Sequence, residues 1–199
     1  MKNIALTLTL FLATLFANLS NAQSPIKNLN EPEYPVDDAY YKDIDSILNP
    51  FVGTWILNNG EQYLKLVFEK KTMFYNGSYY EDLLIGEIQY KENGVELVNT
   101  LGNLSSNLSH LYHHSIYGNN IRNYNSPFAD YTSDNFRIEL LMEEPSGASG
   151  LLDVRIAEVN GQPAIQIFRR GGEIVALSPS DPEPPEAIIP VGFFYLIQQ

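Results

Sequence analysis

The sequence predicts a mainly β protein: an antiparallel up-and-down barrel, or a strongly curved sheet, of about eight strands with a short N-terminal helix. Two observations carry this prediction. From Gly53 onward, apolar and polar residues alternate along short segments, a period of two that is typical of strands with one buried face. Asn93-Gly94 and Asn160-Gly161, which favour tight hairpin turns, each separate two such segments. Their spacing suits a barrel or a sandwich, and alternation alone does not separate the two.

Residues 1–22 are expected to be a secretory signal peptide. Lys2 supplies a positive start, Ile4 to Phe16 is an almost unbroken apolar run, and Ser20-Asn21-Ala22 places small residues at the cleavage positions. An N-terminal membrane anchor is the alternative, but the run is shorter than the ~20 residues that span a bilayer. We therefore expect an exported protein, periplasmic or secreted to the medium or cell surface, with no transmembrane segment in the mature chain.

The mature chain is predicted to be one domain over residues 37–199, preceded by a flexible lead-in over 23–36. The lead-in holds three prolines and lacks any hydrophobic period. The short helix is predicted from Asp37 to Asn49, with Asp37 or Asp38 as its cap and Pro50 as its end. A 3₁₀ or irregular turn is the alternative there.

The predicted strands follow in order along the domain. They are residues 54–57, 63–69, 72–75, 83–91, 95–101, 136–142, 151–158, 164–170, 173–177 and 191–197. Residues 102–133 are predicted to be a long surface loop, with a short ordered piece around Leu111 to Tyr117. Because loops of this length are uncommon and often functional, this is the segment that we expect to carry function. Residues 178–190 hold five prolines and are predicted to be an exposed connector.

One local pattern resembles a known barrel family. Phe51-Val52-Gly53-Thr54-Trp55 resembles the opening of lipocalins and fatty-acid-binding proteins. The resemblance implies a lipocalin-like barrel in which Trp55 plugs the closed end. It also implies that a late arginine, Arg169 or Arg170, stacks on that indole.

A second, longer resemblance covers about residues 40–197. The run from Tyr75 to Glu87, with Phe51 to Trp55 before it and Gly94 to Thr100 after it, is similar to a family of uncharacterised exported proteins from Bacteroidetes-type bacteria. This resemblance implies export and a β-rich single domain. It implies no activity, ligand or site residue.

Charge and composition exclude several classes of function. The net charge of −12 repels phosphate backbones and anionic lipid headgroups, so we expect no nucleic-acid partner. The chain has no cysteine, and therefore no disulfide and no thiolate metal site. Stability must come from packing and hydrogen bonds.

No catalytic set is recognisable in the sequence. The three histidines, His110, His113 and His114, are spaced closely enough for a metal, but they lie in a polar stretch with no acid nearby in sequence. No Gly-x-Ser-x-Gly elbow is present, and the candidate bases all lie in one predicted loop. We therefore predict no catalytic, cofactor-binding or metal-binding residue, and no cofactor.

Acidic residues offer three adjacent carboxylate pairs and a set of candidate calcium ligands. The pairs are Asp37-Asp38, Glu81-Asp82 and Glu143-Glu144, and the calcium candidates are Asp181, Glu183 and Glu186. Adjacent residues on a strand point to opposite faces, which works against the pairs as catalytic dyads. The calcium candidates lack a ligand loop of regular spacing. Glu81-Asp82 is the pair to watch, because tyrosines surround it.

Two functional hypotheses follow, with an enzyme third. The first is a non-catalytic binding module whose barrel cavity holds a small apolar or mixed ligand. The alternative is a cell-envelope or surface interaction protein with a filled core, acting through the long loop and exposed tyrosines. The thirteen tyrosines fit contacts with carbohydrate, peptide or protein, although tyrosine also simply favours strands.

Overall fold

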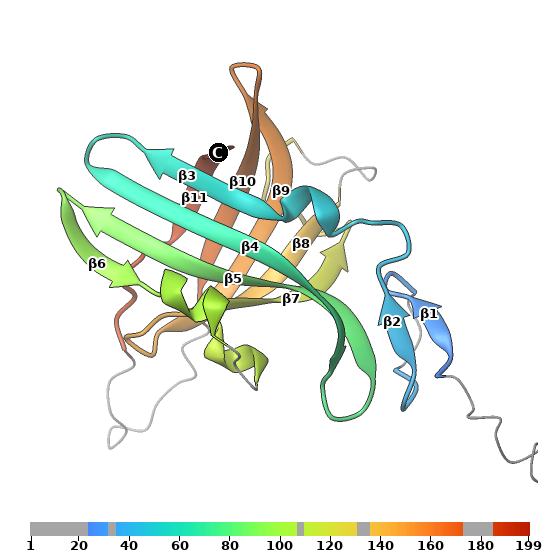
Figure 1. The fold of residues 1–199 in the computed structure, drawn as a ribbon. Coiled ribbons are helices and arrows are strands. Elements are labelled where there is room, and N and C mark those ends of the chain that lie inside the picture. Colours follow the sequence, from blue (N-terminus) through green and yellow to red (C-terminus); the bar gives the residue numbers. More distant parts are fainter. Residues whose placement is uncertain (1–23, 32–34, 107–109, 131–135, 173–184) are drawn as a thin grey trace, which may run out of the picture.

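Eight antiparallel strands close into a barrel in the computed structural model, which describes residues 24–31, 35–106, 110–130, 136–172 and 185–199. The strand order is β3-β4-β5-β7-β8-β9-β10-β11, and β11 returns to pair with β3 (Figure 1). The predicted barrel is therefore confirmed, and the sandwich is not formed. The predicted signal peptide over 1–22 and the predicted strand over 173–177 lie outside the described residues.

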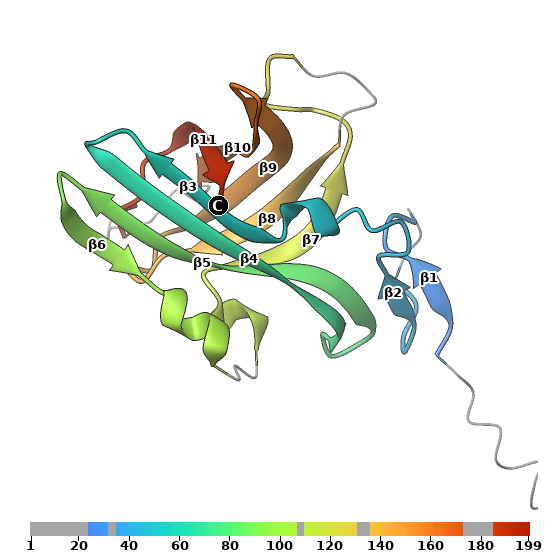
Figure 2. The same ribbon diagram turned by 45° about the horizontal axis from the view of Figure 1, so that its top comes forward.

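The barrel strands differ greatly in length. They are β3 (Gly53–Asn58), β4 (Gln62–Tyr75), β5 (Tyr80–Glu92), β7 (Ile116–Arg122), β8 (Arg137–Glu143), β9 (Ser149–Val159), β10 (Gln162–Gly171) and β11 (Gly192–Gln198). Three short strands lie outside the closed ring: β1 (Ile26–Asn28), β2 (Tyr40–Lys42) and β6 (Val95–Asn99). Three 3₁₀ turns complete the fold: η1 (Asn49–Phe51), η2 (Leu101–Ser105) and η3 (Leu111–His113). Figure 2 shows η2 and η3 on the outside of the barrel, and β1 and β2 to one side of it.

Both predicted Asn-Gly hairpins are present. Asn93 and Gly94 join β5 to β6 with φ values of 50° and 82°, and Asn160 and Gly161 join β9 to β10 with 52° and 77°. Positive φ at both central positions is the turn whose twist matches that of paired strands. These four residues therefore set the register of two hairpins.

The helix predicted over residues 37–49 is wrong. Tyr40–Lys42 forms β2, which pairs in parallel with β1 and with the start of β5, and only η1 at the end of the range is helical. Positive φ at Asp38 (59°) and Ser46 (57°) interrupts any continuous helix. The alternative of a 3₁₀ or irregular turn describes the segment better. β1 likewise falls within the predicted flexible lead-in over 23–36.

Asp82 fixes this N-terminal segment to the barrel. Its buried carboxylate accepts hydrogen bonds from the hydroxyl of Tyr40 at 2.6 Å, and from the backbone N–H groups of Asp43 and Met73 at 3.0 Å each. Asp43 in turn accepts from the N–H groups of two following residues and from Lys70 at 2.7 Å. Side-chain carboxylates thus replace the helical hydrogen bonds that the sequence suggested.

We expect Tyr40 to make the free energy of unfolding depend on pH in the alkaline range. Burial, and then the hydrogen bond to Asp82, raise the pKa of Tyr40 from 10.0 to about 12. The phenol ionises less readily in the fold than in the unfolded chain. The contribution of the neutral phenol to the free energy of unfolding is therefore complete below pH 10 and is lost as the pH rises to about 12. Urea unfolding of wild type and Tyr40→Phe across this interval measures the effect. The free energy of unfolding should fall more steeply in wild type, and equal slopes would contradict the prediction.

The long loop predicted over residues 102–133 contains a barrel strand, so that prediction is wrong in its central part. β7 pairs with β5 on one side and with β8 on the other, and without it the barrel would not close. The predicted ordered piece around Leu111 to Tyr117 overlaps η3 and the start of β7. A bulge between Tyr117 and Asn120 interrupts the alternation by which a strand is recognised.

Side chains fill the barrel interior. A single cluster of buried apolar residues runs through it, including Trp55, Phe68, Ile88, Leu140 and Ile167. Gly86 lies opposite Phe68 on the neighbouring strand, and a Cβ added there would lie 2.6 Å from a carbon of the Phe68 ring. The ring thus occupies the space that a larger residue at position 86 would need, as expected of interiors packed at crystal-like density.

Trp55 is buried, but the arginine partner that the resemblance implies is wrong. The indole is 2% exposed, and its Nε1 donates to the carbonyl of Phe51 at 2.8 Å. Trp55 pairs with Gln198 near the end of β11, whereas Arg169 pairs with Gly192 at the start of the same strand. Six residues of strand correspond to about 20 Å, which prevents stacking. Arg170 points outward and forms an ion pair with Glu139.

Arg169 instead closes the opposite end of the barrel. Its Nη2 donates to Oε1 of Glu144 at 2.6 Å, and both side chains are almost wholly buried. The Glu144 carboxylate also accepts hydrogen bonds from the backbone N–H groups of Ile188, at 2.6 Å, and Ile189, at 3.3 Å. Glu144 therefore attaches the segment before β11 to this end of the barrel by its hydrogen bonds, and the ion pair with Arg169 holds the carboxylate in place.

Candidate functional site

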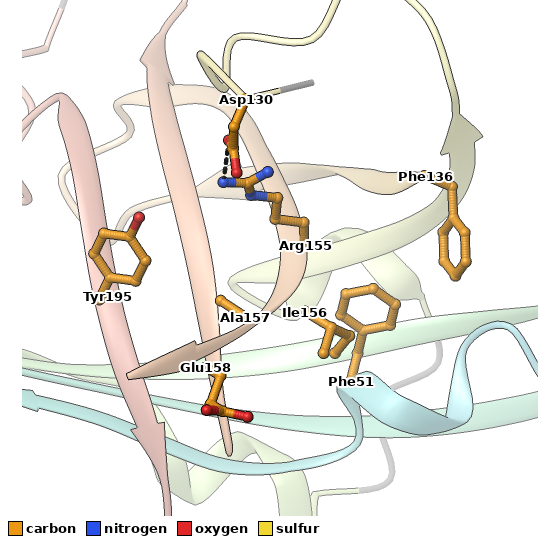
Figure 3. A pocket seen from close by; sticks show the side chains of 8 residues that line it. All are labelled: Phe51, Asp130, Phe136, Arg155, Ile156, Ala157, Glu158 and Tyr195. Carbon is orange, nitrogen blue, oxygen red and sulfur yellow. Dashed lines mark hydrogen bonds and ion pairs between the residues drawn. The ribbon is translucent and has the colours of Figure 1, made fainter. Parts of the chain in front are cut away.

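A cleft of about 380 Å³ opens at the barrel end where β3 and β8 begin and where β9 and β11 end (Figure 3). We call it the mouth cleft. It is lined by Phe51, Asp130, Phe136, Arg155, Ile156, Ala157, Glu158 and Tyr195. These residues come from η1, the chain before β8, the second half of β9 and the middle of β11. The cleft therefore depends on closure of the barrel.

One side of the mouth cleft is apolar. Phe51 and Phe136 meet edge to face, with ring centroids 6.4 Å apart. Ile156 continues the inward row of β9, but unlike the fully buried Val154 it is 47% exposed, because the core ends before it. Figure 3 shows Ile156 beside Phe51, facing Phe136. Phe136, which is 38% exposed, and Ile156 thus offer an open apolar wall on which a ligand can bury apolar surface, and the fully buried Phe51 ring supports it from behind.

The other side of the cleft is polar and held rigidly. Nη2 of Arg155 lies 2.6 Å from Oδ1 of Asp130, and its Nε donates to Oε1 of Gln166 at 2.8 Å. The guanidinium also lies over the ring of Phe128, 4.5 Å from its centroid. The hydrogen bond from Arg155 holds the pKa of Asp130 below its usual value. Arg155 is therefore oriented and largely neutralised before any ligand arrives.

Glu158 and Tyr195 are the remaining polar groups of the cleft, and both are exposed. The carboxylates of Glu158 and Asp130 stand against the single guanidinium of Arg155 in the cleft lining. The cleft thus carries a small excess of negative charge next to an apolar wall. This arrangement suits an amphipathic ligand with a neutral or cationic polar group.

A second cleft, of about 450 Å³, lies on the outer surface of β5, β7, β8 and β9, beside η3. We call it the flank groove. It is lined by Tyr79, Glu81, Leu83, Leu111, Tyr117, Gly118, Asn119, Asn120, Glu139, Leu140, Leu141 and Leu151. A smaller space of about 150 Å³ near β1 and β2 shares Tyr79, Glu81 and Asn119 with it. The two spaces adjoin at these three residues, and neither shares a lining residue with the mouth cleft.

With this geometry in place, comparison with known proteins adds one finding. Residues 1–192 match the model of DUF6705, a family of unknown function. The chain belongs to this family. No curated protein and no solved structure gives a significant match. The expected resemblance to an uncharacterised family is confirmed to that extent.

The histidines of this DUF6705 protein do not gather into one site. His114 is buried, with Nδ1 2.8 Å from Oε1 of Glu87, while the His110 and His113 rings meet edge to face. Ser115 donates to the other oxygen of Glu87 at 2.9 Å. The serine hydroxyl thus faces the carboxylate and not the imidazole, which is not the order that activates a nucleophile. Within the described ranges, no three His, Cys, Asp or Glu residues are grouped as metal ligands.

The carboxylate pairs separate as the strand geometry predicts. Asp82 is buried among structural hydrogen bonds, whereas Glu81 lines the flank groove. Glu144 is buried at the end of the barrel and its neighbour Glu143 is exposed. The separation of Glu81 from Asp82 is therefore confirmed, and of this pair only Glu81 lines a cleft.

The other acidic candidates do not form a site among the described residues. Asp37 accepts a hydrogen bond from the hydroxyl of Ser78, and its neighbour Asp38 is exposed with a positive φ. Glu186 is exposed, and Asp181 and Glu183 lie outside the described residues.

Sequence reasoning missed the mouth cleft. Arg155, Glu158 and Tyr195 were not singled out, because their partners are distant in sequence and meet only when the barrel closes. Asp130 lies in the predicted loop, 25 positions before its partner Arg155. No helix in the described part of the chain is long and apolar enough to cross a membrane.

Proposed function

We propose that this protein is a non-catalytic binding protein and that its small ligand occupies the mouth cleft, not the barrel interior. One observation carries the proposal: apolar side chains fill the barrel from Trp55 to Arg169, while about 380 Å³ remains open at its end. A site of this size, with an apolar wall and a few oriented polar groups, is typical of small-ligand binding. We therefore propose a ligand site at the barrel end in place of the interior cavity expected from the sequence.

The ligand class follows from the lining. The apolar wall of Phe136 and Ile156, supported by the buried Phe51, favours a compact hydrocarbon or aromatic portion. Glu158 and the Tyr195 hydroxyl offer acceptors to a polar group, and Arg155 is already paired with Asp130. We therefore infer a neutral or cationic amphipathic molecule. Export to the periplasm or cell surface, expected from residues 1–22, is part of the same proposal.

Trp55 provides the readout for a test. It is the only tryptophan, and its indole donates to the carbonyl of Phe51, which lines the cleft. We expect saturable changes in Trp55 fluorescence with 4-phenylbutylamine and 4-phenylbutanol. Binding of 4-phenylbutyrate, which has the same carbon skeleton and a negative charge, should be about tenfold weaker, a difference of about 1.4 kcal/mol.

Ile156→Lys is expected to abolish this binding, because it places an ammonium group on the apolar wall. Ile44→Lys is the matched control, since Ile44 is 55% exposed, compared with 47% for Ile156, and lies outside both clefts. Titration of the two variants, each shown by circular dichroism to be folded, checks the prediction. Binding that survives Ile156→Lys would place the ligand elsewhere. The absence of saturable binding to folded wild type would overturn the proposal.

A surface interaction role is the second candidate, favoured by one patch. Phe193 and Tyr195 on the outer face of β11 are 50% and 45% exposed, and Phe193 stacks on Phe168 with centroids 4.3 Å apart. Val191, just before β11, is 56% exposed. Exposed aromatic residues of this kind are enriched at protein interfaces.

A further inference from the structure

The flank groove contains a departure from regular strand geometry that brings two polar side chains together. Neighbouring residues of a strand normally point to opposite faces. In β7 the register shifts between Tyr117, which pairs with Leu141, and Asn120, which pairs with Glu139. As a result, the consecutive residues Asn119 and Asn120 both line the groove. Bulges that redirect side chains in this way are over-represented next to functional sites.

The two asparagines are oriented by neighbours on opposite sides of the groove. Asn119 donates through Nδ2 to Oε2 of Glu81 at 2.7 Å and to the carbonyl of Asp82 at 2.9 Å. Asn120 donates through Nδ2 to Oε1 of Glu139 at 2.8 Å. These bonds fix both carboxamide planes, and because neither carboxamide oxygen accepts a hydrogen bond from a described residue, both can accept one from a ligand. The groove thus presents fixed acceptors on both sides of its floor.

Apolar and aromatic side chains provide the floor between these polar groups. Leu141 is 46% exposed, and Leu83 and Leu151 lie beside it in the groove. Tyr79 and Tyr117 add ring faces and hydroxyls. Burial, followed by the charge of Glu81 for Tyr79 and of Glu143 for Tyr117, raises the pKa of each phenol above its usual value, so both remain proton donors.

The charges of the groove are largely compensated. Arg122 donates to Oε1 of Glu139 through Nε at 2.9 Å and through Nη2 at 2.7 Å, and Arg170 pairs with the other oxygen. Burial opposes ionisation of Glu139, but these hydrogen bonds outweigh it and hold its pKa below the usual value. Of the two carboxylates that line the groove, Glu81 is the one that forms no ion pair with a described residue. An anionic ligand is therefore disfavoured here.

We infer that the flank groove binds a neutral oligosaccharide, with sugar rings against the tyrosines and the leucine floor and with hydroxyls on the asparagine and glutamate side chains. Ring faces combined with fixed, planar hydrogen-bonding groups suit a ligand whose surface alternates apolar C–H faces with hydroxyls. The smaller space beyond Tyr79 lengthens the groove toward β1 and β2, which accommodates more than one sugar unit.

A peptide is a poorer occupant. Extended peptides commonly bind by adding a strand to an open sheet edge. Here β8 has a paired neighbour on both sides, whereas β7 pairs with β8 along its length and with β5 only over residues 116–118. The edge left for an added strand is therefore only residues 119–122, and recognition rests mainly on side chains of the kinds that contact hydroxyls and ring faces.

Isothermal titration calorimetry on the whole chain tests the inference. The probes are cellohexaose, laminarihexaose and chitohexaose, with hexagalacturonate and a tryptic digest of casein as the anionic and peptide arms. We expect saturable binding of at least one neutral hexamer, and Leu141→Arg should weaken it by about tenfold or more. Leu97→Arg is the matched control, because Leu97 is 44% exposed and lies on β6 away from the groove.

Each outcome is decisive. Binding of a neutral hexamer that Leu141→Arg weakens and Leu97→Arg leaves unchanged supports the inference. Binding of hexagalacturonate alone or of peptides alone overturns it, as does the absence of binding to all three neutral hexamers at millimolar concentration. Neutral-hexamer binding that is unaffected by Leu141→Arg, or weakened equally by Ile156→Lys in the mouth cleft, also overturns it. Failure of the mouth cleft to bind phenylbutyl ligands leaves this test unchanged.

Discussion

Glu144→Ala is expected to lower the free energy of unfolding by about 3–5 kcal/mol. The substitution leaves the guanidinium of Arg169 buried without its counter-charge. It also removes the acceptor from the N–H groups of Ile188 and Ile189. Two further nitrogens of Arg169, Nε and Nη1, already have no hydrogen-bond partner among the described residues. Little remains to compensate the charge, so its full desolvation cost falls on the folded state. Urea unfolding followed by circular dichroism gives the magnitude.

Two further variants separate the ion pair from other causes. Glu143→Ala changes the neighbouring, exposed carboxylate and should cost no more than about 0.5 kcal/mol. The double variant Glu144→Ala/Arg169→Met removes both charges, and it should be more stable than Glu144→Ala alone. If the double variant were the less stable of the two, the uncompensated charge would not be the cause.

Gly86→Ala should destabilise the barrel by about 1–3 kcal/mol, although alanine is normally better tolerated than glycine in a strand. The new Cβ would lie 2.6 Å from one carbon of the Phe68 ring and 3.3 Å from Cβ of Ile116. Both neighbours are fully buried, so the ring has no exposed space into which to move. Thermal or urea unfolding measures the loss.

Phe68→Leu provides the second half of this test. Alone it should destabilise the protein by removing buried ring atoms. In combination with Gly86→Ala it should recover part of the loss, because the smaller side chain makes room for the methyl group. A Gly86→Ala variant as stable as wild type would mean that the interior is loosely filled, and would revive the interior cavity as the ligand site.

The fold was predictable because most barrel strands show the two-residue alternation of apolar and polar side chains in their own sequence. Residues 136–140 and 152–156 alternate apolar and polar side chains without interruption, and Asn93-Gly94 and Asn160-Gly161 specify the turns of two hairpins. β7 was missed because the bulge at Gly118 and Asn119 breaks the alternation. The predicted strands over 63–69 and 72–75 proved to be one strand, β4, bent at a second irregularity between Lys71 and Phe74.

The sites were less predictable, for a physical reason. The ion pair of Arg155 with Asp130, and that of Arg169 with Glu144, each join residues 25 positions apart whose pairing depends on strand register. No local pattern encodes such contacts. Glu81 and Asp82 were noted as a pair because tyrosines surround them, but the strand predicted there began at residue 83, so the groove position of Glu81 was not predicted.

The seam between β3 and β11 has a consequence for the order of folding. It is formed by two residue pairs, Ile56 with Ile197 and Trp55 with Gln198, and by a hydrogen bond from the N–H of Gln199 to the carbonyl of Thr54 at 3.0 Å. These partners lie about 140 residues apart, so ring closure requires the last residues of the chain and comes late. Until β11 has formed, β3 and β10 each present an unpaired edge. A chain that lacks its last strand would therefore be the species most prone to pair with another copy of itself.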